Sequence, residues 1–311
     1  MSERVKFRPL DAWWPASRFD IRVYLVQGEK TALIDTGGPG TELPEALDKV
    51  GLTVTDVDQV LLTHGHPDHA GGAGLFKNGA DTQIFIHGDD AIFIEDHDAC
   101  FDRFYAPATT AFLGPEAAAE EKAGFVGFLG ADITPDRLLK DGDLVDLGGG
   151  VALRVVHLPG HTPGSVGFLF EDDGTFVSGD SIPGAGTPDG CLPVILDIET
   201  YRESMERLLT LPIKTLHTTH PFRGIHAEPA TVRQGSDVET YLHECLEFAG
   251  ILWGAMQEQA ELGGGGTMME TADRLIDSLP AELGLRRVAD LPVPGMAMAT
   301  IYWNMQKLMG S

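Results

Sequence analysis

The sequence predicts a layered α/β protein with a helical insertion and a helical C-terminal tail. Short β-rich runs alternate with helical patterns through the first half of the chain, which is typical of an α/β fold. Residues 88–139 interrupt that alternation, and helical patterns dominate from residue 231 onward. A chain of 311 residues with 43% hydrophobic content can bury a sizeable core.

The first half of the chain supplies strands and helices in turn. Two apolar runs flank Gly28 and predict a hairpin, and each later apolar run is followed by a helical pattern. The expected elements are strands at 21–26 and 31–34, a helix at 41–50, a strand at 60–62, a helix at 70–77 and a strand at 83–86.

Residues 88–139 carry many aromatic side chains among acidic and Ala-rich stretches, and we expect a helical insertion there. Its helices could cap a site or pack onto the sheet as an ordinary layer, and the pattern does not decide between these.

Glycine and Asp-Gly turns then separate the next expected elements. These are strands at 143–147, 151–157, 166–170 and 175–178, a helix at 199–209 and a strand at 214–218.

The remaining residues are predicted to be helical. Ser236 and Glu239 have the spacing of a capping box, as have Thr267 and Glu270, and four glycines at 263–266 separate the two helices. A third apolar run spans 296–309. We therefore expect a main α/β domain at 1–230 and a helical subdomain at 231–311, the latter docked on the former or serving as a homo-oligomer contact.

Composition excludes several classes of partner. The formal net charge of −25 disfavours nucleic acid and an anionic membrane surface. No run of roughly 18 apolar residues predicts a membrane span, and the start of the chain lacks the pattern of a secretion signal. The three cysteines are widely spaced and fit no metal or redox motif, so free thiols in the cytoplasm are expected.

The most informative segment follows the predicted strand at 60–62. It places His64, His66, Asp68 and His69 within six residues of a chain that has only 11 histidines. Neutral imidazole and ionised carboxylate bind the same divalent cations. One short turn with this spacing could supply ligands to two metal ions, so we expect further ligands at other strand ends.

Three later positions meet that expectation. His161 lies in a Gly- and Pro-rich turn after the expected strand at 151–157. Asp180 follows the expected strand at 175–178, and His220 follows the one at 214–218. His217 lies on or near the same strand and competes with His220 for the last position.

Together these motifs resemble the metallo-β-lactamase superfamily. The resemblance rests on T-H-x-H-x-D-H, P-G-H-T-P-G-S, S-G-D and a late histidine at a strand end, and it covers residues 21–221. It implies an αββα four-layer sandwich with two metal ions at one edge of the sheets. By this resemblance, the first ion would be held by His64, His66 and His161, the second by Asp68, His69 and His220, and Asp180 would bridge them.

The chemistry implied is hydrolysis of a small-molecule carbonyl compound. Two divalent ions, most simply zinc with iron or manganese as alternatives, would acidify a shared water to a hydroxide that attacks an ester, lactone or thioester. Asp68 would orient that nucleophile and carry a proton.

The subclass stays open at this point. An aspartate at position 180 resembles the glyoxalase II and lactonase branches rather than the lactamases, and the acidic composition disfavours the nuclease branch. A persulfide dioxygenase with one iron is the alternative reaction class, and a metal-stabilised binding protein is a third. If Phe101, Phe104, Tyr105 and Phe112 faced the metals, the pocket would favour an apolar acyl or lactone group.

Overall fold

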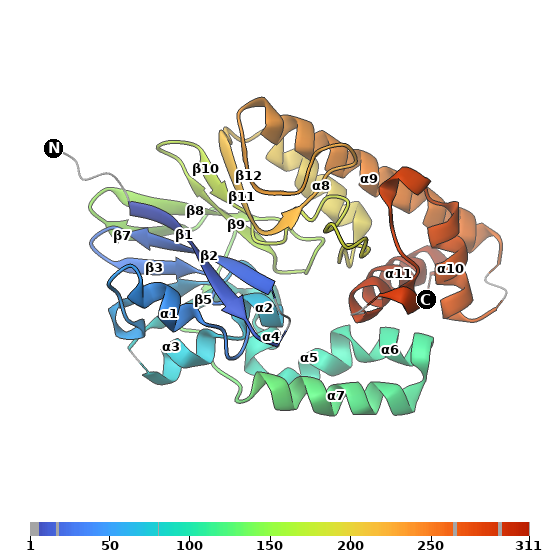
Figure 1. The fold of residues 1–311 in the computed structure, drawn as a ribbon, viewed down its shortest axis with the longest axis horizontal. Coiled ribbons are helices and arrows are strands. Elements are labelled where there is room, and N and C mark those ends of the chain that lie inside the picture. Colours follow the sequence, from blue (N-terminus) through green and yellow to red (C-terminus); the bar gives the residue numbers. More distant parts are fainter. Residues whose placement is uncertain (1–5, 17–18, 80, 264–265, 292–293, 311) are drawn as a thin grey trace.

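Two six-stranded sheets form the centre of the protein in the computed structural model (Figure 1). The structure describes residues 6–16, 19–79, 81–263, 266–291 and 294–310. Two of the glycines predicted to separate the tail helices, Gly264 and Gly265, lie outside these ranges.

The first sheet contains strands β1 to β6 in chain order. The strands are β1 (Lys6–Trp14), β2 (Phe19–Gln27), β3 (Thr31–Ile34), β4 (Gln59–Leu61), β5 (Gln83–His87) and β6 (Arg137–Leu139). The predicted hairpin is confirmed, because β2 and β3 pair antiparallel with Tyr24 opposite Ile34. From β3 to β6 the pairing is parallel, so these strands all end at one edge of the sheet.

The second sheet has the order β12-β11-β10-β9-β8-β7. Its strands are β7 (Leu144–Gly148), β8 (Val151–His157), β9 (Val166–Phe170), β10 (Thr175–Val177), β11 (Thr215–Phe222) and β12 (Ala230–Gln234). β11 was expected to end before His220, and this was wrong. The strand passes through His220, because a register shift after His217 lets it resume pairing with β12 at Phe222.

Apolar side chains fill the space between the sheets. Tyr24, Ile34 and Leu61 of the first sheet share one buried cluster with Phe168 and Val177 of the second. Side chains on the opposite faces belong to two other clusters, which helices cover. The αββα four-layer sandwich is therefore confirmed.

Short helices cover the first sheet. They are α1 (Leu43–Asp48), α3 (Ala73–Gly79) and α4 (Ile92–Glu95), with the single turns η1 (Val54–Asp56), α2 (Pro67–Ala70) and η2 (Gly88–Asp90). Leu47, Phe76 and Ile94 bury their side chains in the outer cluster of this sheet. The predicted helix at 70–77 is two helices, and Asp68 and His69 lie on the first of them.

The helical insertion consists of α4, α5 (His97–Phe104), α6 (Ala106–Leu113) and α7 (Pro115–Leu129). It ends before residue 137, because residues 137–139 form the edge strand β6. Figure 1 shows α5 to α7 extending away from the sandwich, with α11 (Pro294–Met309) on the facing side. Trp303 of α11 donates a hydrogen bond from Nε1 to the Phe104 carbonyl, at 3.1 Å.

Helices α8 (Ile198–Leu208) and α9 (Ser236–Glu261) pack together on the side of the second sheet. Helices α10 (Met268–Ser278) and α11 pack on α9, with the turns η3 (Ala281–Leu283) and η4 (Val288–Asp290) between them. Phe176 of the sheet, Met205 of α8, Phe248 of α9 and Met298 of α11 share one buried cluster. The tail thus packs against the sandwich through a common core.

The two predicted capping boxes have different outcomes. Thr267 and Glu270 form one at the start of α10, with reciprocal bonds of 2.7 and 3.2 Å. The prediction for Ser236 and Glu239 was wrong, because Gly235 occupies the cap position with a φ of 58° and Ser236 is already helical.

Two further expectations concern the whole chain. Cys100, Cys191 and Cys245 are free and buried. Among the described residues, every helix is too short or too polar to cross a membrane.

Candidate metal centre

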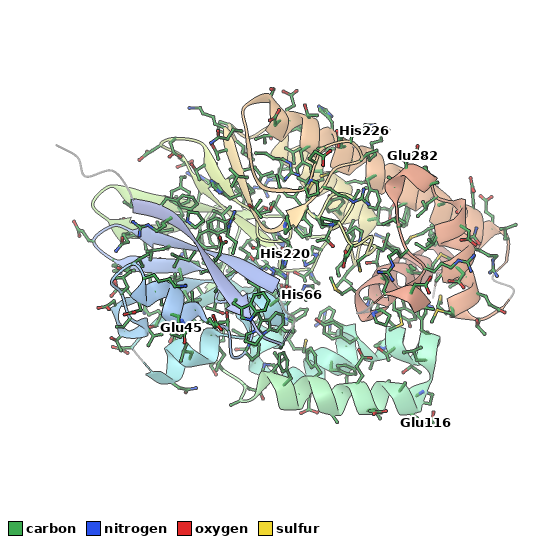
Figure 2. The ribbon with its side chains drawn as sticks, in the orientation of Figure 1. Glu45, His66, Glu116, His220, His226 and Glu282 are labelled. Atoms are coloured by element: carbon green, nitrogen blue, oxygen red, sulfur yellow. The ribbon has the colours of Figure 1, made fainter. Side chains whose placement is uncertain are left out.

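All seven predicted ligand residues lie at one edge of the sandwich. His64 and His66 follow β4, α2 carries Asp68 and His69, and the other three come from the second sheet or its turns. Figure 2 labels His66 and His220, which come from different sheets and lie close together at the sandwich edge nearest the helical insertion and α11. The structure divides the seven residues into two groups. Within each group, all the candidate ligand atoms lie within 4.8 Å of one another.

The first group consists of three imidazoles. His66 Nδ1 lies 3.0 Å from His64 Nε2 and 2.9 Å from His161 Nε2. The remaining pair, His64 Nε2 and His161 Nε2, is 3.2 Å apart. Zinc–nitrogen bonds of about 2.0–2.1 Å place two ligands of a tetrahedral ion roughly 3.3 Å apart, close to the observed separations.

The other ring nitrogens of His64 and His161 fix the tautomers of these two residues. His161 Nδ1 donates to the Val194 carbonyl at 2.7 Å. His64 Nδ1 lies 3.1 Å from the Thr63 hydroxyl, which gives its own proton to a carboxylate and therefore accepts from the imidazole. The Nε2 lone pairs of His64 and His161 consequently face each other with no proton between them, an arrangement that a bound cation would stabilise.

The three imidazoles are held neutral. Burial, followed by the neighbouring histidines, lowers the pKa of His64 well below its ordinary value. Burial also lowers the pKa of His66 to about 3 and lowers that of His161. Neutral imidazole is the form that binds metal ions, so the group is ready to act as a ligand set near neutral pH.

The second group combines two histidines with two carboxylates. His220 Nε2 lies 3.0 Å from Asp68 Oδ2 and 3.5 Å from Asp180 Oδ2. His69 Nε2 lies 3.6 Å from Asp68 Oδ2 and 3.4 Å from Asp180 Oδ2. The His69 ring is centred 4.0 Å from that of His64, so the two groups adjoin.

The electrostatics of the second group favour positive charge. Burial would lower the pKa of His69, but Asp180, Asp68 and Asp35 together raise it well above its ordinary value. Burial would likewise raise the pKa of Asp68, yet His69 and His220 hold it well below its usual range. His69 Nε2 and Asp180 Oδ1 are buried without a hydrogen-bond partner, which is the condition of ligand atoms awaiting a cation. The residues present therefore fit two divalent ions.

Asp35 orients His69, a role that the sequence patterns did not reveal. Its Oδ2 accepts a 2.8 Å hydrogen bond from His69 Nδ1, and it also accepts from the backbone and hydroxyl of Thr63. Asp35 is buried and has a φ of 64°, which is uncommon outside glycine. Its position after β3, parallel to β4 and ending at the same edge, is the signal that could have indicated it.

Asp90 joins the two histidine turns of the first group. Its carboxylate accepts hydrogen bonds from the Gly65 and Gly164 backbones at 3.0 and 2.7 Å and from the Thr162 hydroxyl at 2.7 Å. Burial raises the pKa of Asp90 to about 6. Nothing in the sequence around Asp90 distinguishes it from a surface carboxylate, so only the structure reveals this role.

Two other histidine groups lie outside the centre. His217 is buried, with its ring against Phe7 and Tyr24 at 4.9 and 5.4 Å. His87 and His157 lie near Asp89, but their rings stack 4.1 Å apart with only 11° between the planes. The lone pair of an imidazole lies in its ring plane, so two stacked rings cannot both point at one ion.

The helical insertion places aromatic rings beside the centre. Phe93 and Tyr105 are centred 5.7 and 6.5 Å from the His66 ring. Phe104 stacks on Phe93, and Phe101 stacks on Tyr105. Phe101 and Phe104 therefore support the two rings beside His66 rather than face the histidines. The fourth predicted aromatic, Phe112, packs instead against the core of the second sheet.

A two-sheet sandwich with a histidine and aspartate centre at one edge defines a class of metal-dependent hydrolases. The family model of the metallo-beta-lactamase superfamily matches residues 17–220, and the chain belongs to that superfamily. Members of the superfamily bind divalent metals, typically two.

Individual relatives are distant. A hydroxyacylglutathione hydrolase of Hyphomonas neptunium is 29% identical over 201 residues, which cover 64% of this chain and 60% of that protein. A probable metallo-hydrolase of Bacillus subtilis is 28% identical, with 68% of each chain covered. This chain thus matches less than two thirds of the length of the first of these relatives.

One solved structure resembles nearly the whole chain. It is a metallo-beta-lactamase family protein of Thermus thermophilus, with a TM-score of 0.71, 22% identity, and coverage of 98% of this chain and 93% of that one. At this identity the likeness concerns the fold, and it includes the helical tail.

Proposed function

We propose that the protein is a dinuclear metal-dependent hydrolase acting on an ester, lactone or thioester of a small molecule. The observation that carries the proposal is the convergence of seven side chains into two adjoining groups, one purely imidazole and one mixed with carboxylate. The first ion would be held by His64, His66 and His161, the second by Asp68, His69 and His220, and both by Asp180. Bound ions of this kind acidify water and polarise a carbonyl.

Asp68 is suited to move a proton. Its side chain is 23% exposed, more than those of His69, Asp180 and His220, so a substrate can reach it. The 3.0 Å contact with His220 keeps one oxygen, Oδ2, turned toward the second group. The carboxylate can accept a proton as the nucleophile forms and return it to the leaving group.

The substrate we propose carries an apolar group near the carbonyl. Tyr105, beside His66, and Leu196 are half-buried and belong to one aromatic cluster, whereas Phe93 is only 2% exposed and supports this surface from within. Such a surface binds apolar or aromatic acyl groups by burying their area. Thioesters belong in the test panel because hydroxyacylglutathione hydrolases are among the relatives.

Metal analysis of the purified full-length protein, coupled to a panel of aromatic and short-chain esters, lactones and thioesters, tests the proposal. We expect about two divalent ions per chain and hydrolysis of at least one class. Asp180→Ala and His66→Ala should each lower the metal content and abolish activity. His243→Ala, which removes an exposed histidine of α9, is the control and should change neither.

Two results would contradict the proposal. Full activity in either ligand variant would overturn the assignment of the centre. A single iron per chain, with oxygen uptake on a persulfide and no hydrolysis of the panel, would move the protein to dioxygenase chemistry.

A further inference from the structure

The tail helix α11 reaches the loop that orients His161. Thr300 and Asn304 are polar residues of this helix, and both are fully buried. Their side chains hydrogen-bond to the backbone of residues 193–198, the loop that precedes α8. A buried polar side chain in an apolar helix face costs free energy unless each polar atom is satisfied, and here the loop satisfies them.

Thr300 acts on one particular peptide unit. Its Oγ1 accepts from Ile195 N–H at 3.0 Å and donates to the Pro193 carbonyl at 2.9 Å. The Ile195 N–H shares its peptide plane with the Val194 carbonyl, which accepts the 2.7 Å hydrogen bond from His161 Nδ1. Because a peptide is planar, fixing its N–H also fixes the direction of its carbonyl.

Asn304 holds the next part of the same loop. Its Nδ2 donates to the Ile195 carbonyl at 2.8 Å, and its Oδ1 accepts from Ile198 N–H at 2.9 Å. The peptide that receives His161 therefore has restrained neighbours on both sides. Hydrogen bonds in such a chain also polarise one another, which strengthens the bond to the imidazole.

We propose that Thr300 is a positioning residue for the metal centre, acting through the 194–195 peptide to hold His161 with Nδ1 protonated and Nε2 free to bind the ion. This inference rests on the proposed function, since it takes His161 as a ligand. It assigns to the C-terminal tail a part in metal binding. Outer-shell partners of this kind change metal affinity by about 10- to 100-fold when removed.

The experiment compares Thr300→Val with Thr300→Ser in the full-length protein. Valine keeps the shape and removes the hydroxyl, whereas serine keeps the hydroxyl. Thr271→Val, at a buried threonine of α10, is the matched control. Zinc affinity is measured by chelator competition, and the cobalt-substituted proteins are compared by their visible spectra.

Thr300→Val should weaken binding of one ion by about 10- to 100-fold and shift the cobalt spectrum. Thr300→Ser should restore both readouts to within a few-fold of wild type, and Thr271→Val should leave them unchanged. Wild-type affinity and spectrum in Thr300→Val would overturn the inference while leaving the proposed function intact. A wild-type protein that binds no divalent metal would reject both.

A second measurement needs no variant, should Thr300→Val fail to fold. Nitrogen-15 NMR of the histidine rings in the zinc-loaded wild type identifies the protonated nitrogen of His161. A proton on Nδ1 supports the inference. A proton on Nε2 would overturn it, because the Val194 carbonyl would then have no imidazole donor.

Discussion

His217 should lower the free energy of unfolding at acidic pH, and His217→Phe should remove this effect. The side chain is buried edge-on against the stacked rings of Phe7 and Tyr24, and its Nδ1 has no hydrogen-bond partner. Burial, together with the nearby Arg22 cation, lowers the pKa of His217 from 6.5 to about 4, while Asp173 opposes the shift. Folding therefore disfavours the protonated imidazole.

The sign and size follow from proton linkage. Between pH 6.5 and 4 the unfolded chain protonates this histidine more readily than the folded one, so the free energy of unfolding falls as the pH falls. The penalty is negligible above pH 7, about 1.4 kcal/mol at pH 5.5 and about 3 kcal/mol at pH 4.

Urea unfolding of wild type and His217→Phe at pH 7.5, 5.5 and 4 measures this contribution. Phenylalanine fills a similar volume and cannot titrate, so the variant should gain about 3 kcal/mol relative to wild type between pH 7.5 and 4. Acid effects at the metal centre are common to both proteins and cancel in the difference. His243→Phe, at an exposed site, is the control. A difference between wild type and His217→Phe that does not change with pH would refute the reasoning.

Three further changes have expected outcomes. Asp90→Ala leaves two buried N–H groups without an acceptor and should lower the free energy of unfolding by on the order of 3 kcal/mol, measured by urea unfolding at pH 8; an unchanged midpoint would contradict its bridging role. Thr267→Ala should cost about 1 kcal/mol by loss of the capping box, whereas Ser236→Ala, at a helical position, should cost only a few tenths; equal losses in calorimetry would argue against the cap assignment. Tyr105→Ala should raise KM for an aromatic ester more than for an acetate ester; equal changes would remove Tyr105 from the substrate wall.

The strands that were missed from the sequence share one property. β1, β6 and β12 are all edge strands, each with a single neighbour in its sheet. β1 contains Pro9, and β12 is mostly polar or half-exposed, so neither shows the continuous apolar run of a central strand. By contrast β8 and β9 lie inside a sheet, and their predicted limits match the structure.

The residues of the candidate centre also differ in how far they could be predicted from local sequence patterns. The seven ligand candidates were identified because their spacing and strand-end positions are local features. Asp90 contacts Gly65 between His64 and His66, and Thr300 contacts the loop that receives His161, each across 25 residues or more of sequence. Such contacts depend on the packing of elements that meet only in the folded chain, so a single sequence does not reveal them.

The orientation of the centre is consequently distributed over the whole molecule. Asp35 fixes His69 from the end of β3, and Asp90 from the start of the helical insertion ties the two turns that carry the first group. From the tail, Thr300 holds the 194–195 peptide that accepts the hydrogen bond of His161. Gly65 adds a steric link, because a Cβ there would lie 2.2 Å from Phe93 of the insertion. The glycine between the two histidines is therefore required for packing rather than for metal binding. A ligand motif transplanted without these supports would retain its donor atoms but lose their directions, and metal affinity depends on both.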